Sequence, residues 1–444
     1  MMDGSAKKVL IITYYWPPSG GSGVQRWLKF SKYLPSFGWT PIIYTPEDPD
    51  FGIKDPTLLK DIPKEAIEIK RPIWEPYAIY RTLTGNKDAK ANFGAATPKE
   101  GGNLMSKFAG WVRGNVFIPD PRVFWQKPSI QFLSEYLQEN PVDVVITTGP
   151  PHSMHLIGLG LKKRFPKLIW MADMRDPWST FDLHNTFMSR AAKAKNARFE
   201  KEVLDHADRV IMVSPSSHEE FQSFDRNKEV LITNGFDEDD FDSVRPVHSG
   251  KFSIYHSGLL NFIRNPENFW KVLDKLCKEN QDFNQDFELH LIGAVDSLIM
   301  EAISKYDFLK KKVTERGWLQ HNEIIEENNK ASVLMLVVNN SRNAEAQLPG
   351  KFFEYLALGK PILGICPDDA DISKAIQKTK TGFTCNFEEE GSLEKIILTL
   401  YKNWKEKSPL NSDDNEIRAF ERKTLTKKLV QTMDDCLFSP PIAK

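Results

Sequence analysis

Residues 8–45, KVLIITYYWPPSGGSGVQRWLKFSKYLPSFGWTPIIYT, decide the class of fold. The apolar, β-rich run 8–15 predicts a buried parallel strand, because it is short and ends at a turn rich in glycine and proline. The helical pattern VQRWLKFSKYL follows and ends at Gly38, before the strand-like run 40–45. The chain therefore opens with a βαβ unit, the building block of a doubly wound α/β domain.

The same alternation of strands and helices continues to about residue 405. Further strand-like runs in the first half are VDVVITT (142–148), KLIWMAD (167–173), DRVIMVS (208–214) and EVLITNG (229–235). Those in the second half are KFSIYHSG (251–258), FELHLIG (287–293), KVTERGW (312–318), ASVLMLVV (331–338) and KPILGIC (360–366). Helical patterns separate most of them, so each half predicts one Rossmann-like domain.

We therefore expect an α/β protein with two Rossmann-like doubly wound domains that face each other across a cleft. The first domain is predicted at 1–235, with an insertion at about 81–115, and the second at 250–405. The junction falls in NGFDEDDFDSVRPVHSG (234–250), which is polar, rich in turn residues and without periodicity. Amphipathic helices at 412–438 are expected to cross back and pack on the first domain.

The composition of the 444 residues, 41% hydrophobic and 27% charged, is that of an ordinary globular protein. Four separated cysteines, with no CxxC and no Cys/His ligand spacing, predict neither a disulfide framework nor a zinc site. No run reaches 18 apolar residues and the first apolar run is too short for a signal peptide, so we expect a cytoplasmic location. A net charge of −1 argues against nucleic acid as a partner.

Positive charge is concentrated in residues 81–128, which carry eight Lys or Arg against three acidic residues, a net of +5. Within it, NLMSKFAGWVRGNVFI (103–118) mixes large apolar residues with Lys107 and Arg113. Such a segment is typical of a helix at a membrane interface, although an ordinary packed helix fits the pattern as well. An anionic membrane surface is thus a candidate partner for 81–128.

The turn PPSGGSGVQR (17–26) is a candidate anion site, because Gly20, Gly21 and Gly23 lie between a strand and a helix. Without Cβ atoms, backbone N–H groups and the helix N-terminus can approach a diphosphate closely. The glycines could equally have a purely steric role. Arg26 occupies the third glycine position of the dinucleotide fingerprint, which argues against an oxidoreductase, and the GK[ST] of a P-loop is absent.

The segment NAEAQLPGKFFEYLALGKPILGI (343–365) is the most informative about function. PGK precedes an amphipathic helix that places Lys351 and Glu354 three residues apart, on one face near its start. Lys351 can neutralise phosphate, and a carboxylate such as Glu354 can accept hydrogen bonds from vicinal ribose hydroxyls. The alternative is an ordinary surface pair between the two side chains.

Several motifs together resemble the retaining GT-B glycosyltransferases of family four, also called group 1. They are YYWPPSGGSGVQR, TTGPPHSMHLIG, ADMRDPW, ADRVIMVS, ITNGFD, YHSGLLNFIRNPE and LPGKFFEYLALGKPIL. Their order and spacing are similar to those of the family over nearly the whole chain, except about 50–110. The resemblance implies the GT-B fold and a nucleotide diphosphate sugar as donor.

Matched position by position, the resemblance assigns Glu354 to the donor ribose and the loop Ala344 to Gly350 to the donor sugar. Arg264 and Lys351 would neutralise the diphosphate, where negative charge grows as the glycosidic bond breaks. The further donor-binding residues predicted are Gly21, Gly23, Ser257, Gly258, Glu345 and Gly350. No DxD motif stands in a suitable context, so we expect no metal and no cofactor besides the donor substrate.

The chain departs from the family pattern at two places. Where members often have a second glutamate, this sequence has Ala346, with Glu345 one position away. Where many members have a histidine after the strand 142–148, it has Thr148, and His152 is a candidate substitute in the catalytic site. The alternative for His152 is a structural role in its turn, and we expect His155 to be structural.

Thr148, Arg175 and Asp176 are the candidate acceptor-binding residues. Arg175 and Asp176 follow a predicted strand, at the edge where doubly wound sheets bind ligands. A structural Arg–Asp pair is the alternative.

The resemblance implies transfer, with retention of configuration, from a UDP-, GDP- or similar sugar to a lipid-linked or polysaccharide acceptor in bacterial surface glycan synthesis. The protein would then work in the cytoplasm, or peripherally on the inner face of the membrane. The alternatives are a nucleotide-sugar epimerase or phosphorylase, or a non-catalytic scaffold that binds sugar nucleotides. The sequence indicates neither the base and sugar of the donor nor the identity of the acceptor.

Overall fold

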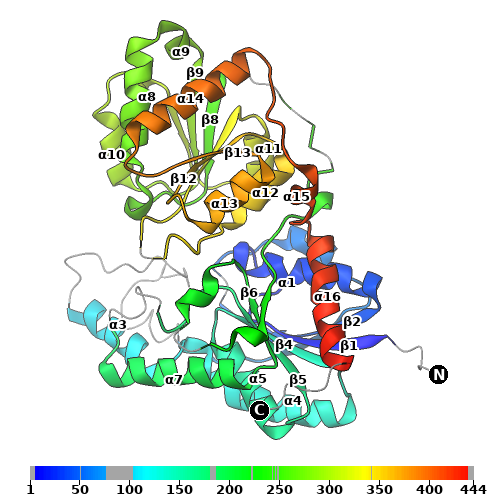
Figure 1. The fold of residues 1–444 in the computed structure, drawn as a ribbon. Coiled ribbons are helices and arrows are strands. Elements are labelled where there is room, and N and C mark those ends of the chain that lie inside the picture. The colour runs from blue at the N-terminus through cyan, green and yellow to red at the C-terminus, as the bar shows by residue number, and fades with distance from the viewer. Residues whose placement is uncertain are drawn as a thin grey trace. The chain divides into compact units, whose positions relative to one another are not determined.

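The protein is described by a computed structural model that covers residues 6–50, 52–76, 104–180, 187–221, 224–242, 244–245, 247, 250–341 and 343–438 (Figure 1). The chain forms two compact units. The first contains 1–233 and 425–444, and the second contains 234–424.

The first unit is built on a parallel sheet with the strand order β3-β2-β1-β4-β5-β6-β7. The strands are β1 (Lys7–Ile12), β2 (Trp39–Pro46), β3 (Ile67–Arg71), β4 (Val144–Gly149), β5 (Ile169–Met174), β6 (Arg209–Met212) and β7 (Glu229–Leu231). The direction of winding reverses between β1 and β4, which is the ligand-binding edge of a doubly wound sheet.

Helices cover both faces of this sheet. They are α1 (Ser22–Tyr33), α3 (Leu104–Val116), α4 (Gln126–Glu139), α5 (Ser153–Arg164), α7 (Arg190–His206) and α16 (Arg422–Phe438). Alternate β1 residues point to opposite faces: Val9 and Ile11 pack with apolar residues of α1 and α16, while Leu10 and Ile12 pack with those of α4, α5 and α7. The sheet is thus buried on both sides.

The C-terminal segment divides between the two units. Leu425, Leu429 and Met433 of α16 join the core of the first unit, and Lys7 forms an ion pair with Asp434 at 2.6 Å. The helix α15 (Asp414–Arg418) belongs to the second unit, although we had grouped it with the helices that pack on the first. Ile417 contacts the apolar core around α12 and α13, which explains the difference.

The second unit repeats the plan with a parallel sheet in the order β10-β9-β8-β11-β12-β13. The strands are β8 (Phe252–Ser257), β9 (Phe287–Ile292), β10 (Val313–Arg316), β11 (Val333–Val337), β12 (Ile362–Ile365) and β13 (Gly382–Cys385). Its winding reverses between β8 and β11. The predicted class, α/β with two Rossmann-like doubly wound sheets, is confirmed.

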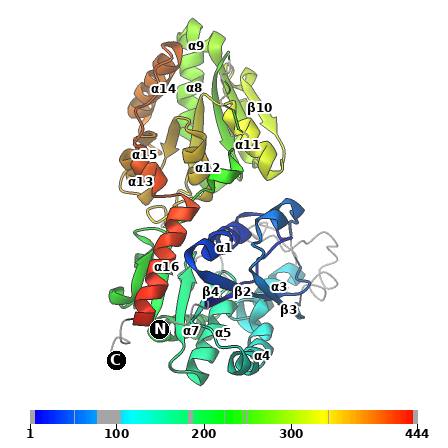
Figure 2. The ribbon, with the colours of Figure 1, turned by 90° about the vertical axis from the view of Figure 1, so that its right-hand side faces the viewer.

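The helices of the second unit form layers on both sides of its sheet, as Figure 2 shows. They are α8 (Glu267–Glu279), α9 (Gln281–Asp286), α10 (Ser297–Ser304), α11 (His321–Asn329), α12 (Gly350–Leu358), α13 (Asp371–Thr379), α14 (Glu390–Lys405) and α15. Apolar residues of α8, α9, α10 and α14 pack on one face, and those of α12 and α13 pack on the other.

Two strands were missed in the sequence, and both lie at the edges of their sheets. The strand β3 has the sequence IEIKR and is mostly exposed, so it lacks an apolar run. The strand β13 has only four residues and starts with glycine. Edge strands contribute little to the buried core, so their sequences carry a weak apolar pattern.

Helix α3 lies within the segment that we considered interfacial. Its glycines face the residues just before α7: a Cβ atom at Gly114 would lie 3.3 Å from the carbonyl carbon and oxygen of Phe187. Asn115 Nδ2 also donates to the Phe187 carbonyl at 2.7 Å. One side of α3 is therefore packed on protein, while Trp111 is exposed.

One of the positive charges in the basic stretch 81–128 lies inside the first unit. Arg122 is fully buried, and its Nε atom lies 3.1 Å from Glu75 Oε1, so this positive charge is neutralised inside the first unit. Arg81, Lys87, Lys90 and Lys99, with most of the insertion expected at 81–115, lie outside the described residues. No helix in the described ranges has the length and apolar character needed to cross a bilayer.

Two glycines bring the carboxyl ends of β8 and β9 together. Gly258 and Gly293 have φ angles of 113° and 110°, in the region that favours glycine. The Gly258 N–H donates to the Ile292 carbonyl oxygen at 2.7 Å. A Cβ atom at Gly293 would lie 2.7 Å from the Gly258 carbonyl oxygen. Only glycine fits at 293 without a shift of the backbone that carries Gly258.

We predict that Gly293→Ala destabilises the second unit by about 1–3 kcal/mol, because the new methyl group meets backbone and φ is unfavourable. Gly391→Ala is the control, since Gly391 lies in the first turn of α14 with open space at its Cβ position. Thermal unfolding followed by circular dichroism should show a lower Tm for Gly293→Ala alone. Equal melting of both variants would refute the close approach.

Candidate functional site

The predicted donor residues of the second unit come from β8, the segment after it, and α12. Helix α12 begins at Gly350, directly after Pro349, and its first turn leaves backbone N–H groups without partners within the helix. Lys351 and Glu354 lie in this first turn and a half. Strand β8 ends at Ser257, at the edge where the winding reverses, so the sequence motifs YHSG and PGK meet at one place.

The ammonium group of Lys351 is buried against Gly258. A Cβ atom at position 258 would lie 3.2 Å from Lys351 Nζ, so a side chain there would displace the ammonium group. Among the described residues, none accepts a hydrogen bond from Nζ. Burial, and secondly the nearby Arg264, lower the pKa of Lys351 to about 7, although Glu354 opposes the shift.

Arg264 is the second cation of this site, and it is held by the segments around it. Its Nε atom donates to Asn339 Oδ1 at 2.5 Å, and its Nη1 atom donates to the Leu259 carbonyl at 3.1 Å. The Asn339 N–H in turn donates to Gln347 Oε1 at 3.0 Å. Burial lowers the pKa of Arg264 from its usual value.

Glu354 lies between a histidine and two other charged groups. His321 Nδ1, on the first residue of α11, is 3.8 Å from Glu354 Oε1. Burial raises the pKa of the Glu354 carboxyl group. His321 and then Lys351 oppose this rise, while Asp240 adds to it. The Glu354 side chain keeps about 30% of its surface exposed, so a ligand can reach it.

Ser257 ties β8 to the two helices that carry the other groups. Its hydroxyl donates to Asn328 Oδ1 on α11, and its N–H donates to the Tyr355 hydroxyl on α12 at 3.4 Å. Ser257 is itself buried, so it positions the end of β8.

The other two predicted residues of this loop are exposed. Gly350 has open space at its Cβ position, and it starts α12. The Glu345 side chain points to solvent, while its carbonyl accepts from the Asp371 N–H at 2.8 Å and fixes the loop against α13. The structure thus brings Ser257, Gly258, Arg264, Lys351 and Glu354 together, with Glu345 at the edge.

A buried carboxylate organises the first unit at the ends of β4 and β5. Asp173 is fully buried and receives hydrogen bonds from Arg26 Nη2 (2.8 Å), Trp27 Nε1 (2.8 Å) and Thr148 Oγ1 (2.8 Å). Burial opposes ionisation, but Arg26 beside it holds the pKa of Asp173 below its usual range. The Thr148 hydroxyl therefore donates to Asp173, so this candidate acceptor residue has a structural contact.

Arg175 fastens three backbone segments of the first unit. Its guanidinium donates to the carbonyls of Gly149 (3.2 Å), Pro150 (2.6 Å) and Gly23 (2.9 Å). Arg175 therefore joins the ends of β4 and β5 to the start of α1. Asp176 follows it with an exposed side chain, which is free to meet a ligand at the sheet edge.

His152 and His155 lie beside Gly149, where a Cβ atom would be 3.0 Å from His152 Nδ1 and 2.5 Å from His155 Nε2. His152 stacks on Trp178 with a centroid distance of 4.7 Å and is 7% exposed. The Thr147 hydroxyl lies 2.9 Å from His155 Nδ1, and burial lowers the pKa of His155 to about 3. His155 is therefore neutral and part of the core, as expected.

The glycine turn of the first unit has two distinct roles. Gly21 has a φ of 83° and open space, and it directly precedes α1. Gly23 lies against the Tyr15 ring, where a Cβ atom would come within 2.9 Å. Gly23 is thus required by packing, and Gly21 by the conformation that starts the helix; the predicted diphosphate contact of both stays a prediction.

Sequence reasoning missed the residues that position the cations and the carboxylate. Asn339 and Gln347 orient Arg264, and Asn328 orients Ser257, but amides at these spacings form no recognisable pattern. His321 was missed because only the fold brings α11 next to α12. His256 lies inside YHSG; burial holds its pKa well below normal, and its Nδ1 contacts the Met335 carbonyl at 3.1 Å.

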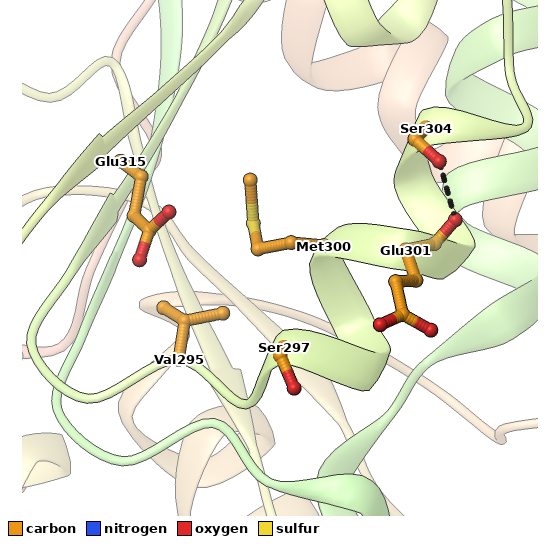
Figure 3. A pocket seen from close by; sticks show the side chains of 6 residues that line it. All are labelled: Val295, Ser297, Met300, Glu301, Ser304 and Glu315. Carbon is orange, nitrogen blue, oxygen red and sulfur yellow. Dashed lines mark hydrogen bonds between the residues drawn. The ribbon is translucent and has the colours of Figure 1, made fainter.

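A separate hollow of about 450 Å³ opens on the second unit beside α10 and β10 (Figure 3). Glu315 lies on one side of it, and Met300 and Glu301 lie on the other. Two carboxylates would repel a diphosphate, so this hollow is not the donor site. Within the ranges that the structure describes, no three His, Cys, Asp or Glu side chains are grouped to hold a metal ion.

The fold defines the class of protein, and comparisons with known proteins agree with it. Similar solved structures include sucrose-phosphate synthase from Thermosynechococcus elongatus (TM-score 0.62, 14% identity, covering 97% of this chain and 98% of that one). A glycosyltransferase from Rickettsia africae gives a TM-score of 0.60 at 15% identity, with 98% and 99% covered. The Anabaena HepE protein in complex with UDP-glucose gives 0.60 at 13%, with 96% and 99% covered. These likenesses identify the GT-B fold.

One family model matches part of the sequence. Residues 94–240 match the family model described as Glycosyltransferase Family 4. The predicted resemblance to the family-four GT-B glycosyltransferases is confirmed, and the match points to glycosyl transfer as the class of reaction. The search of curated protein sequences gave no match.

We predict that Asp173→Asn destabilises the first unit by about 3–5 kcal/mol, because it removes the carboxylate charge that pairs with the buried Arg26 guanidinium. Asp205→Asn is the control, since Asp205 pairs with Lys201 on the exposed surface of α7 and should change stability by less than about 1 kcal/mol. Urea unfolding measures both. If Asp173→Asn unfolds at the same urea concentration as the control, Asp173 does not organise this unit.

Proposed function

We propose that this protein is a retaining glycosyltransferase that moves a sugar from a nucleoside diphosphate to a lipid-linked or polysaccharide acceptor. The observation that carries the proposal is the buried Lys351 ammonium group, with Arg264 beside it and, among the described residues, no hydrogen-bond acceptor from the protein. An unpaired buried cation is costly, and a diphosphate would offset this cost.

The two cations supply the electrostatic stabilisation that sugar transfer requires. When the bond between the anomeric carbon and the diphosphate oxygen breaks, its electron pair stays on the diphosphate. Lys351 and Arg264 would stabilise that charge, with help from the N–H groups at the start of α12. Because these groups already provide positive charge, we propose that the reaction needs no metal ion, and that EDTA leaves the rate unchanged.

Glu354 would bind the ribose of the donor. Its carboxylate can accept hydrogen bonds from both vicinal hydroxyls, while Lys351, three residues earlier on α12, binds the phosphates. The complex of the similar HepE protein with UDP-glucose supports a UDP-sugar as the first donor to test.

The acceptor is proposed to bind to the first unit, at the ends of β4 and β5. Asp176 offers an exposed carboxylate there, and His152 lies at the start of α5. Arg175 and Thr148 would act indirectly, by holding the backbone that carries these groups. Retention of configuration and an acceptor in bacterial surface glycan synthesis belong to this proposal, with the reaction taking place at the inner face of the membrane.

Binding of UDP-, GDP- and ADP-glucose tests the donor site, first by thermal shift and then by calorimetry. We predict that the preferred donor binds roughly 10- to 100-fold more weakly to Glu354→Ala, because hydrogen bonds to a charged group are lost. Glu315→Ala, in the hollow beside α10, is the matched control and should bind like the wild type. The proposal fails if no donor raises the Tm of the wild-type protein.

The affinity for the donor should have a maximum near neutral pH. A bound diphosphate favours the charged form of Lys351, so affinity is highest below the pKa of about 7 and decreases as the pH rises above it. At the acidic end, protonation of Glu354, whose pKa is raised by burial, removes the ribose acceptor. Calorimetry from pH 5 to 9 measures the loss of affinity on the acidic side, the acidic limb, and on the alkaline side, the alkaline limb. Lys351→Gln should show no alkaline limb.

A further inference from the structure

Helix α11 contacts two elements of the proposed donor site, α12 and β8. Its first residue, His321, lies 3.8 Å from the Glu354 carboxylate on α12, and near its other end Asn328 accepts the Ser257 hydroxyl of β8. The start of α11 is fixed as well, because the Gln320 N–H donates to Glu323 Oε2 at 2.7 Å in a capping box. His321 is therefore presented to Glu354 from a helix whose two ends are both anchored.

The surroundings of Glu354 determine how readily its carboxyl group carries a negative charge. Within the described ranges, the titratable groups that act on Glu354 are His321 from α11, Lys351 from α12 and Asp240 from the 3-10 turn Glu238–Asp240. Asp240 and burial disfavour a carboxylate, and Lys351 is needed for the diphosphate. His321 is thus the neighbour of Glu354 that can support its negative charge without being used for the phosphates.

We propose that His321 is a positioning residue, which keeps the Glu354 carboxylate charged and directed at the two ribose hydroxyls of the donor. This inference rests on the proposed function. His321 itself need not touch the substrate: the 3.8 Å between Nδ1 and Oε1 is longer than a hydrogen bond, so the two groups act on each other through charge or through a bridging water.

The test compares two ligands that differ only at the ribose. One is the diphosphate glucose that gives the largest thermal shift among UDP-, GDP- and ADP-glucose, and the other is its 2′,3′-dideoxy analogue. We expect His321→Ala to weaken binding of the first ligand about 3- to 10-fold, a change of about 0.7–1.4 kcal/mol, and to leave binding of the second unchanged. His321→Lys, which places a positive charge at this position, should restore the stronger binding of the first ligand.

The pH profile provides an independent readout. Since His321 opposes the rise in the pKa of Glu354, removing it should move the acidic limb of binding to higher pH. His290→Ala is the matched control, because His290 forms a similar pair with Glu288 on β9 (3.3 Å) outside this site. In His290→Ala, neither the affinity for the diphosphate glucose nor the acidic limb of its binding should change.

Each outcome decides one question. Weaker binding of the ribose-containing ligand alone, with a shifted acidic limb and rescue by lysine, supports the positioning role. Equal loss for both ligands, or no loss, overturns it while the proposed function stands. If the wild-type protein binds none of the three diphosphate sugars, the proposed function itself fails and the role of His321 fails with it.

Discussion

The site in the second unit depends on one constraint, the burial of a lysine ammonium group where the protein offers it no acceptor. Within the described residues, Lys351 Nζ lies against Gly258 with no hydrogen-bond partner, and Arg264 adds a second positive charge. Such an arrangement destabilises the free protein and favours the neutral amine. A dianionic diphosphate would reverse both effects, so the cost of burying the ammonium group would be offset when the donor binds.

The neighbouring structure follows from keeping that ammonium group in place. Gly258 has a φ of 113°, which favours glycine, and a Cβ atom there would lie 3.2 Å from Lys351 Nζ. Gly293 has to be a glycine because a Cβ atom there would lie 2.7 Å from the Gly258 carbonyl oxygen. Asn339 holds Arg264, and Ser257 ties β8 to α11 and α12. The first unit differs in this respect, because its buried Asp173 carboxylate accepts hydrogen bonds from Arg26, Trp27 and Thr148.

The sequence predicts most of this fold, because strands buried on both faces leave continuous apolar runs and each Rossmann-like half repeats the pattern. Edge strands such as β3 lack that pattern. In the site, Lys351 and Glu354 were singled out by the family resemblance of their segment, since their spacing alone also fits an ordinary surface pair. His321 and Asn339 depend on contacts between distant segments, which no sequence pattern indicates. The charge of Arg122 was misjudged, because the sequence does not indicate that it is paired with Glu75 inside the core.

Proton uptake on donor binding tests the central claim most directly. Calorimetry at pH 8, in buffers with different ionisation enthalpies, measures the protons bound along with the diphosphate sugar. If the Lys351 pKa of about 7 rises on binding, uptake should approach about one proton per molecule and disappear in Lys351→Gln. Donor binding without proton uptake, or the same uptake in the variant, would contradict the account.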